Sequence, residues 1–405
     1  MKILFVLHQD PLGYPAGIEQ YLLDLMHGLR DEFNCKIYLF FPKGDKCILR
    51  FVSNNNGDDK IIPATKVDLT TVSNKIIENV FLDVLNQHKF DIVHFQSLRN
   101  LPLSLVECAK ENGRATILSI HDYFIWCVNF ILLNPNFCYF ESNDVKCYEC
   151  LRKLGYNVSC DYISCRRNYV NHLMDIVDAI ICPSHYIRDL LVELFSNSVL
   201  DRAIIIENGS KKSDFLYNRQ DTLSLSNKYL KVAFIGNFLR HKGSKLFEEL
   251  LNEFENGNEI KFYIIGNLYE RLQKTSRNLA VIGGYYRGNM GKILFENQID
   301  IALLLSIIPE TFSFTLSEVI LAEIPTLALD LGAIRDRISR YKTGILIPHE
   351  NSVPYLKNHL EYFIKNKSIL SSFKNNCKKA KKLIPNTSNM VRNYYELYLR
   401  LLETF

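Results

Sequence analysis

Short apolar runs alternate with amphipathic stretches along the first half of the chain. The amphipathic stretches, such as residues 19–29 and 101–113, have helix-like patterns. The apolar runs are continuous, which is typical of strands in a parallel sheet that is covered on both faces. They cover residues 2–7, 36–41, 91–95, 115–120 and 178–182. The pattern predicts a Rossmann-like α/β domain.

The second half repeats the same alternation. Its apolar runs cover residues 231–236, 261–266, 280–284, 299–305 and 325–330. Two such series predict two domains, which we place at residues 1–215 and 229–388, with the polar stretch 217–228 as a linker. The segment 389–405 carries a face of Tyr and Leu side chains and is predicted to form a helix. The predicted fold class is α/β.

The composition is that of a globular enzyme. The 405 residues are 47% hydrophobic and 23% charged, with a formal net charge of +4 and no long basic arm. No apolar stretch approaches the roughly 18–20 residues that span a bilayer, and the first apolar run is too short for a signal peptide. We therefore expect a cytoplasmic protein that does not bind nucleic acid. The lysine-rich segment 374–383 is interpreted as a solvated helix face, with peripheral contact to the inner face of an anionic membrane as the alternative.

Six of the eleven cysteines gather in a predicted insertion at about residues 127–168. Two of them form a Cys-x-x-Cys pair, and thiolates at this spacing bind Zn²⁺. The zinc candidates are Cys138, Cys147, Cys150 and Cys160. The spacing around the pair is irregular, so we prefer free thiols in a loop-rich insertion over structural zinc. A disulfide is the least expected state in a reducing compartment.

Two glutamates, Glu310 and Glu318, stand at the end of one predicted strand and in the early turns of the next predicted helix. In open α/β sheets, ligands bind at the carboxyl ends of the strands. Carboxylates accept hydrogen bonds from hydroxyl-rich ligands, and a helix N-terminus beside them attracts an anion. The pair predicts a sugar-nucleotide site, although the spacing alone favours an ordinary surface turn and helix start.

Three further turns follow predicted strands. Gly17 in the first loop leaves room for a phosphate near the backbone, but the loop lacks the G-x-G-x-x-G pattern of a nicotinamide site. His121 is placed to orient an acceptor or to move a proton. Lys242 precedes a predicted helix and is placed to neutralise a diphosphate, with Arg240 nearby. An ordinary structural turn is the alternative at each of these positions.

Taken together, these motifs resemble the family-4 glycosyltransferases, which are retaining enzymes of the GT-B fold. The matching segments occur in the family's order along nearly the whole chain. They are the first loop before Glu19, DIVHFQ at 91–96, IHDY at 120–123, CPSHYIRD at 182–189, IENGS at 206–210, the turn Lys242-Gly243, the spacing Glu310-x7-Glu318 and EIPTLALDLGAIRDRI at 323–338. The resemblance implies two Rossmann-like domains that face each other across a cleft. It also implies that helix 389–405 packs back on the first domain.

The resemblance implies a role for each matching residue. Glu310 would hold the hydroxyls of the donor sugar, Glu318 would bind the ribose hydroxyls of the nucleotide, and Lys242 would stabilise the leaving diphosphate. His121 would line the sugar or acceptor site, and Gly17 would let the first loop approach the donor. We take Glu310, His121 and Lys242 as the catalytic candidates. Further donor contacts would come from Asn237, Arg240, Phe312, Ser313, Phe314 and Thr315.

Three positions depart from the family pattern. Asn237 stands where many members have arginine, and Ser313 lies in a stretch where glycines are frequent. The family segment that ends in glutamate reads Gly332 to Asp336 here, with a shorter acid. These departures bear on the donor's identity more than on the fold.

The sequence therefore predicts a retaining glycosyltransferase that moves a hexose from a UDP- or GDP-sugar. The expected acceptor is a glycan or a lipid-linked saccharide, in the synthesis of a bacterial-type surface polysaccharide such as lipopolysaccharide. Lysine and helix N-termini suffice to stabilise the leaving group, so no metal or other cofactor is required by this logic. One alternative is a non-catalytic GT-B partner subunit that binds a glycan or a catalytic homologue. Another is an epimerase acting on nucleotide sugars.

Overall fold

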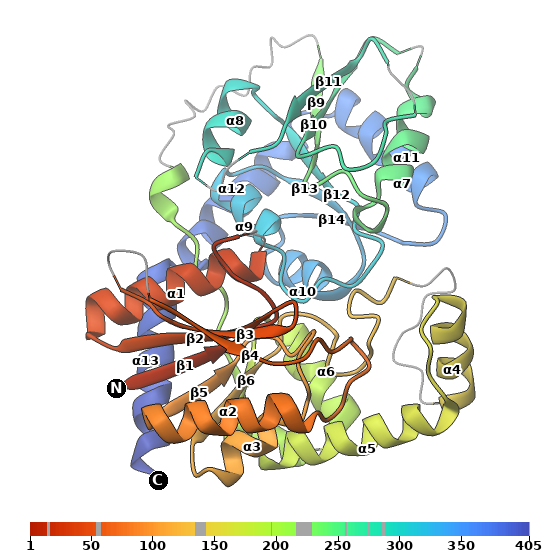
Figure 1. Ribbon diagram of the computed structural model, residues 1–405. Helices are drawn as coiled ribbons and strands as arrows, with labels where there is room; N and C mark the ends of the chain where they lie inside the picture. Colours follow the sequence, from red (N-terminus) through yellow and green to blue (C-terminus); the bar gives the residue numbers. More distant parts are fainter. Residues whose placement is uncertain are drawn as a thin grey trace. The chain divides into compact units, whose positions relative to one another are not determined.

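The chain forms two compact units (Figure 1). The first comprises Met1–Asn208 together with Thr387–Phe405, and the second comprises Gly209–Asn386. The first boundary falls after Asn208, whereas the sequence analysis placed it at residue 215. The predicted linker 217–228 lies outside the described residues. The structure is a computed structural model that describes the chain except for residues 14–16, 54–57, 134–142, 196, 216–228, 256, 274–275, 286–287 and 405.

The first unit is built on a mixed sheet with the strand order β4-β3-β2-β1-β5-β6-β7-β8. Strands β2, β1, β5, β6, β7 and β8 are parallel to one another. At one edge, β3 pairs antiparallel with β2, and β4 pairs antiparallel with β3. All five apolar runs predicted for this half form parallel strands. The predicted runs do not include β3, β4 or β8, and most side chains of β4 are exposed. The bounds are β1 Lys2–Val6, β2 Lys36–Lys43, β3 Lys46–Phe51, β4 Asp59–Pro63, β5 Ile92–Phe95, β6 Ala115–Ser119, β7 Ala179–Cys182 and β8 Ala203–Ile205.

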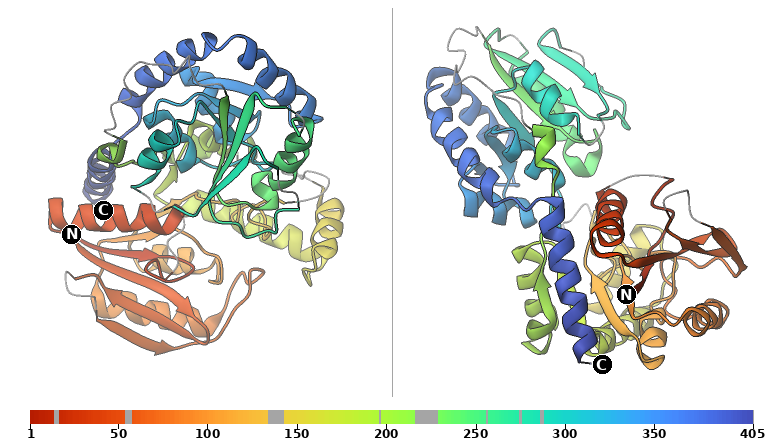
Figure 2. Two further views of the ribbon diagram at one scale, coloured as in Figure 1. Left: turned by 90° about the horizontal axis from the view of Figure 1, so that it is seen from above. Right: turned by 90° about the vertical axis from the view of Figure 1, so that its left-hand side faces the viewer.

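Helices cover both faces of this sheet. Side chains of α2, α3, α5 and α6 join one continuous apolar core with the strands. Helices α1 and α13 pack against each other within the same unit, so the end of the chain returns to the first unit; Figure 2 shows α13 in dark blue. The bounds are α1 Gly17–Phe33, α2 Lys75–His88, α3 Leu105–Glu111, α4 Asp144–Lys153, α5 Cys160–Ile176, α6 His185–Phe195, η1 Asn197–Arg202 and α13 Thr387–Glu403.

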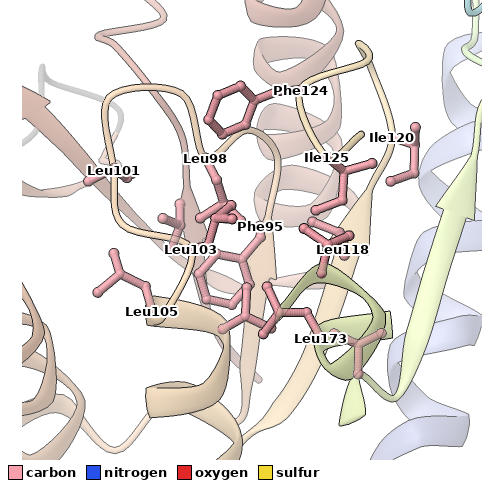
Figure 3. Close-up of a cluster of buried hydrophobic side chains, with 14 of the residues drawn as sticks. Phe95, Leu98, Leu101, Leu103, Leu105, Leu118, Ile120, Phe124, Ile125 and Leu173 are labelled. Atoms are coloured by element: carbon pink, nitrogen blue, oxygen red, sulfur yellow. The ribbon is translucent and has the colours of Figure 1, made fainter. Parts of the chain in front are cut away.

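The apolar core of the first unit fixes the carboxyl ends of its central strands. Phe95 ends β5 and Leu118 lies on the neighbouring strand β6, and both side chains are buried in a cluster with Leu173 of α5 (Figure 3). Burying each such side chain stabilises the fold by about 1.5–3 kcal/mol. The loops that follow β5 and β6 therefore leave from a rigid base.

A buried polar network fastens α13 to the other face of the sheet. Nδ1 of His94 on β5 lies 2.7 Å from the hydroxyl of Tyr398, and Nε2 lies 2.8 Å from the hydroxyl of Ser119 on β6. His94 and Tyr398 are fully buried. Buried polar groups need such partners, so the pairing selects this position for the helix. His94, one of the residues that carried the family resemblance, thus has a structural role.

Two segments of the cysteine-rich insertion are helical, so the expectation of a loop-rich insertion is wrong for residues 144–153 and 160–168. Asn143 and Ser159 cap α4 and α5, because their side chains accept hydrogen bonds from backbone amides of the first turns. The only side chain of α4 that is fully buried is Leu151. With so few buried positions, the helix leaves little apolar periodicity in the sequence.

The second unit contains a parallel sheet with the strand order β11-β10-β9-β12-β13-β14. The five apolar runs predicted for this half correspond to β9 to β13, and β14 is an addition at the edge. The strand bounds are β9 Leu230–Ile235, β10 Ile260–Ile265, β11 Leu279–Gly283, β12 Ile301–Leu304, β13 Thr326–Leu329 and β14 Gly344–Ile347. The predicted α/β fold class with two Rossmann-like units is confirmed.

Two separate apolar cores lie on the two faces of this sheet. Helices α7, α11 and the first turn of α12 contribute to one core, and α8, α9, α10 and the later part of α12 contribute to the other. The strand order reverses between β9 and β12, and in doubly wound sheets ligands bind outside the carboxyl ends of the strands at such a reversal. The helix bounds are η2 Lys212–Phe215, η3 Arg240–Lys242, α7 Ser244–Glu253, α8 Met290–Glu296, α9 Phe314–Leu321, α10 Gly332–Tyr341, α11 Ser352–Lys365 and α12 Ile369–Leu383.

Candidate functional site

The turn after β9 is fastened to the chain that leaves β12. Gly243, which follows η3, has a φ of +88°, and a Cβ atom on it would lie 2.1 Å from the carbonyl oxygen of Leu305. Only glycine tolerates both conditions. The amide of Ile307 donates a hydrogen bond of 3.0 Å to the carbonyl of His241. The turn that carries Lys242 is therefore held beside the segment that carries Glu310.

Lys242 and Glu310 form an ion pair at the reversal of the strand order. Nζ of Lys242 lies 2.7 Å from Oε1 of Glu310, and the exposed fractions of the two side chains are 34% and 16%. Burial raises the pKa of Glu310, but the ammonium of Lys242 and the hydroxyls of Ser313 and Ser306 outweigh burial and hold that pKa below its usual value. Glu310 is therefore an ionised acceptor at neutral pH.

The start of α10 lies directly behind Glu310. Gly332 has a φ of +57°, and a Cβ atom on it would approach the backbone nitrogen and oxygen of Glu310 to within 2.7 and 2.8 Å. The amide of Ala333 donates a hydrogen bond of 2.9 Å to the carbonyl of Glu310. These two residues, which the family resemblance had matched, thus fix the backbone of the glutamate.

The start of α9 has an unusual backbone conformation. Ser313 has φ +72° and ψ +92°, a left-handed region that side chains other than glycine rarely occupy. Its hydroxyl accepts a hydrogen bond from the amide of Leu316 and so caps the helix. The position where the family pattern favours glycine is thus one where a glycine would be relaxed.

Glu318 on α9 is almost fully buried, with an exposed fraction of 8%. The hydroxyl of Tyr285 lies 3.5 Å from its Oε2. Burial raises the pKa of Tyr285, and the charges of Glu318 and, more weakly, of Glu310 raise it further. The charges of both carboxylates therefore influence the same tyrosine, so the fold brings the two predicted site glutamates close to each other.

The other predicted donor contacts are distributed around this pair. Asn237 and Arg240 are exposed, and the backbone amide of Arg240 donates a hydrogen bond of 2.6 Å to Glu270. The Phe312 side chain is buried, whereas Phe314 and Thr315 are half-buried at the start of α9. The side chain of Phe312 is therefore not available for a ligand contact.

His121 follows β6 in the first unit. Its Nε2 lies 2.8 Å from Oε1 of Gln96, and since that oxygen only accepts, Nε2 carries the proton. Burial and the charge of Arg99 lower the pKa of His121 to about 3. The ring is therefore neutral at physiological pH. It also contacts the ring of Tyr21, with centroids 4.8 Å apart.

Sequence reasoning missed a cluster of charged side chains beside His121. Arg99 forms an ion pair of 3.1 Å with Asp122, and its guanidinium lies 2.6 Å from Nε2 of His8. His8 lies 3.5 Å from Oε1 of Glu19, which is also buried. These residues follow β1, β5 and β6 or begin α1, so polar residues directly after predicted strands were the signal that could have identified them.

Gly17 is the first residue of α1 and is exposed. Of the zinc candidates, Cys138 lies outside the described residues, Cys147 and Cys150 lie on α4, and Cys160 begins α5. Arg167 donates a hydrogen bond of 3.1 Å to the sulfur of Cys147. Within the described ranges, no group of three or more His, Cys, Asp or Glu side chains is arranged to hold a metal ion.

The described helices include none that is both long and apolar enough to cross a membrane.

Both units match known glycosyltransferase families. Residues 15–210 match the model described as Glycosyltransferase Family 4, and residues 218–383 match the model described as Glycosyl transferases group 1. No curated protein matches the sequence.

Solved structures share the architecture along the whole chain. HepE of Anabaena, solved with UDP-glucose, has a TM-score of 0.64 and 14% identity, and the match covers 100% of both chains. Sucrose-phosphate synthase from Thermosynechococcus elongatus has a TM-score of 0.68 and 12% identity over 100% of both chains. The lipopolysaccharide outer core galactosyltransferase WaaB has a TM-score of 0.59 and 14% identity over 98% of both chains. With one family match in each unit, the chain is a glycosyltransferase of the GT-B fold.

Proposed function

We propose that this protein is a retaining, family-4 glycosyltransferase that moves a hexose from a UDP- or GDP-sugar to a glycan or lipid-linked saccharide. The observation that carries the proposal is the ion pair of Lys242 and Glu310 at the reversal of the strand order, beside the start of α9 and Glu318. HepE, a structural neighbour, was solved with UDP-glucose, which supports a UDP-sugar donor. The likeness to WaaB supports a role in surface polysaccharide synthesis.

The two carboxylates suit the two hydroxyl-bearing parts of such a donor. Glu310 is held ionised, so it only accepts hydrogen bonds and would take them from hydroxyls of the transferred sugar. Glu318 would accept them from the ribose. Because Glu318 is nearly buried, water competes weakly for these hydrogen bonds.

Lys242 would stabilise the leaving diphosphate. When the anomeric C–O bond breaks, its electron pair goes to a phosphate oxygen, and the ammonium of Lys242 and the amides at the start of α9 neutralise that charge. The acceptor hydroxyl forms the new C–O bond on the same face of the sugar and gives its proton to the leaving phosphate. This sequence of events retains the anomeric configuration. His121, being neutral, would orient the acceptor through hydrogen bonds rather than through charge.

A second candidate function is that of a partner subunit that binds a nucleotide sugar or a glycan without turnover. It is favoured by Asn237, which leaves the turn after β9 without the arginine of many family members, and by the strained Ser313 in place of glycine. This candidate predicts nucleotide binding without transfer, so a single assay separates the two.

We also propose that the protein is cytoplasmic and touches the inner face of the membrane through α12. Lys379 and Lys382 are exposed on this helix, and Leu383 beside them is 65% exposed. Lys381 is partly neutralised by Glu323 at 3.1 Å. Exposed lysines beside an exposed leucine suit an anionic lipid surface, where a lipid-linked acceptor would be found.

The first experiment is a thermal-shift screen of UDP, GDP, ADP and their common sugar conjugates. A ligand that binds the folded state raises its apparent stability, so the best nucleotide identifies the donor class. Glu318→Ala should abolish that shift. Stabilisation that is the same in wild type and Glu318→Ala would remove Glu318 from the site.

The second experiment measures sugar transfer with the donor so identified. Removing a group that stabilises the leaving charge lowers kcat by about 10²–10³-fold, so the kcat of Lys242→Met should fall by that factor. The kcat of Glu310→Gln should also be severely reduced. Lys245→Met is the matched control, because Lys245 is 78% exposed on the neighbouring helix α7. Near-normal transfer by both site variants would overturn the assignment. Nucleotide binding by the wild type with no transfer to any glycan or lipid acceptor would favour the partner subunit.

A further inference from the structure

Arg337 is a fully buried charged side chain close to the candidate site. It lies on α10 with an exposed fraction of 0%. One terminal nitrogen donates hydrogen bonds of 3.2 Å to the carbonyl of Phe312 and 2.9 Å to the carbonyl of Ser313. The other donates a hydrogen bond of 2.7 Å to the hydroxyl of Ser317, and the guanidinium lies 4.3 Å from the ring centroid of Phe312. One side chain thus binds the backbone just before α9 and a hydroxyl in the first turns of the helix.

The contacts of Arg337 determine where the amides of this segment point. In a trans peptide, the C=O and the following N–H point in opposite directions. With the carbonyls of Phe312 and Ser313 turned toward Arg337, the N–H groups of Ser313 and Phe314 are aimed away from it. These are the groups that a helix N-terminus offers to an anion.

The same contacts hold a backbone conformation that the sequence does not favour. Ser313 has a φ of +72°, and a residue other than glycine keeps such a conformation only where its surroundings impose it. The rigid fork of a guanidinium can hold the two carbonyls with one nitrogen and the Ser317 hydroxyl with the other, whereas the single ammonium of lysine is a point donor on a flexible stem. Arginine is therefore suited to this position in a way that lysine is not.

We propose that Arg337 is a positioning residue that aims the amides of Ser313 and Phe314 at the diphosphate of the donor. This inference rests on the proposed function. Arg337 does not touch the donor; it acts through the backbone at the start of α9. The contribution of the diphosphate to binding should therefore depend on Arg337, and the contribution of the nucleoside should not.

The experiment compares how two probes bind: the nucleoside diphosphate that binds best among UDP, GDP and ADP, and the corresponding nucleoside. In Arg337→Met, the Kd of the diphosphate should rise about tenfold, which corresponds to about 1.4 kcal/mol, while the Kd of the nucleoside changes less than about twofold. Arg337→Lys should give an intermediate loss. In transfer assays, kcat should fall more than KM rises, because the amides also stabilise the leaving diphosphate.

A second substitution separates positioning from general damage to the fold. Glycine adopts a φ of +72° without strain, so Ser313→Gly combined with Arg337→Met should recover part of the lost diphosphate affinity. Ser313→Gly alone leaves the hydrogen bonds of Arg337 to the backbone carbonyls in place and serves as the control. Where Arg337→Met does not fold, Arg337→Lys with and without Ser313→Gly gives the same comparison.

The outcomes distinguish this inference from the proposed function. If the wild type binds the diphosphate and the folded Arg337 variants bind it equally well, or lose nucleoside and diphosphate affinity alike, the positioning role is wrong and the donor site stands. If the wild type binds none of the three diphosphates, the proposed function fails and this inference fails with it.

Discussion

Removing Lys242 should make the stability of the protein depend on pH through the titration of Glu310. The pair joins Nζ and Oε1 at 2.7 Å, and the glutamate side chain is only 16% exposed. An exposed ion pair contributes about 0–1 kcal/mol, whereas breaking a buried one costs about 3–5 kcal/mol. For this partly buried pair, we expect Lys242→Met to lower the free energy of unfolding by about 2 kcal/mol at neutral pH.

The sign of the pH dependence follows from the pKa of Glu310. In the wild type this pKa lies below its ordinary value of 4.5, so the stabilisation is present above that value and is lost as the pH falls through the folded-state pKa. In Lys242→Met the burial remains without its compensating charge, so the pKa of Glu310 should rise above its ordinary value. The difference in stability between wild type and variant should therefore grow from pH 5 to pH 8, as the buried carboxyl of the variant loses its proton.

The assay is urea unfolding at pH 5 and pH 8 of wild type, Lys242→Met, Glu310→Gln and the double variant. Glu310→Gln removes the titrating group, so the double variant should be more stable than Lys242→Met at pH 8. The additional loss of stability at pH 8 compared with pH 5 should then disappear. Lys245→Met is again the control for losing a positive charge nearby. A loss in Lys242→Met that is the same at both pH values, or one that adds simply to that of Glu310→Gln, would refute the coupling.

Two further predictions concern the first unit and α12. Because the pKa of His121 is lowered to about 3, its ring stays neutral from pH 5 to 8, so His121→Asn should reduce kcat/KM without moving the acid limb of its pH profile in that range; a shifted limb would show that His121 titrates there. Replacing the exposed Lys379 and Lys382 by Gln should weaken binding to anionic phospholipid vesicles by about 2 kcal/mol, with zwitterionic vesicles as the control. Equal sedimentation of wild type and double variant with anionic vesicles would exclude α12 as the membrane contact.

The local pattern of the sequence predicted the elements that carry the site. Most of the ten predicted parallel strands are buried on both faces, so their apolar runs are continuous and visible without any tertiary information. The exception is the edge strand β11, where Val281 and Ile282 are exposed. Glu310, Lys242 and His121 could be identified because each lies in the segment that follows such a strand, and strand ends are where open sheets bind ligands. Helix α9 begins directly after Ser313, so Glu318 lies in the early turns of a helix, as predicted.

Two of the elements that the sequence did not predict depend for their stability on partners rather than on pattern. Helix α4 fully buries only one side chain, Leu151, so its apolar period is faint. Strand β4 is exposed along most of its length and is defined by pairing with β3. His94 belongs to a segment that matches the family, and only its contact with Tyr398, 304 residues later, gives it a structural role.

Only the tertiary structure decided how the site is held. Lys242 and Glu310 are 68 residues apart, and they meet because β9 and β12 are neighbours in the sheet, which no local pattern encodes. The left-handed conformation of Ser313 and the burial of Arg337 behind it depend on α10 packing against the entry into α9. The sequence by itself determined the class of fold and the residues with suitable chemistry. The order of the strands and the packing of buried side chains decided which of them act together, because such contacts form only between elements that the folded core brings side by side.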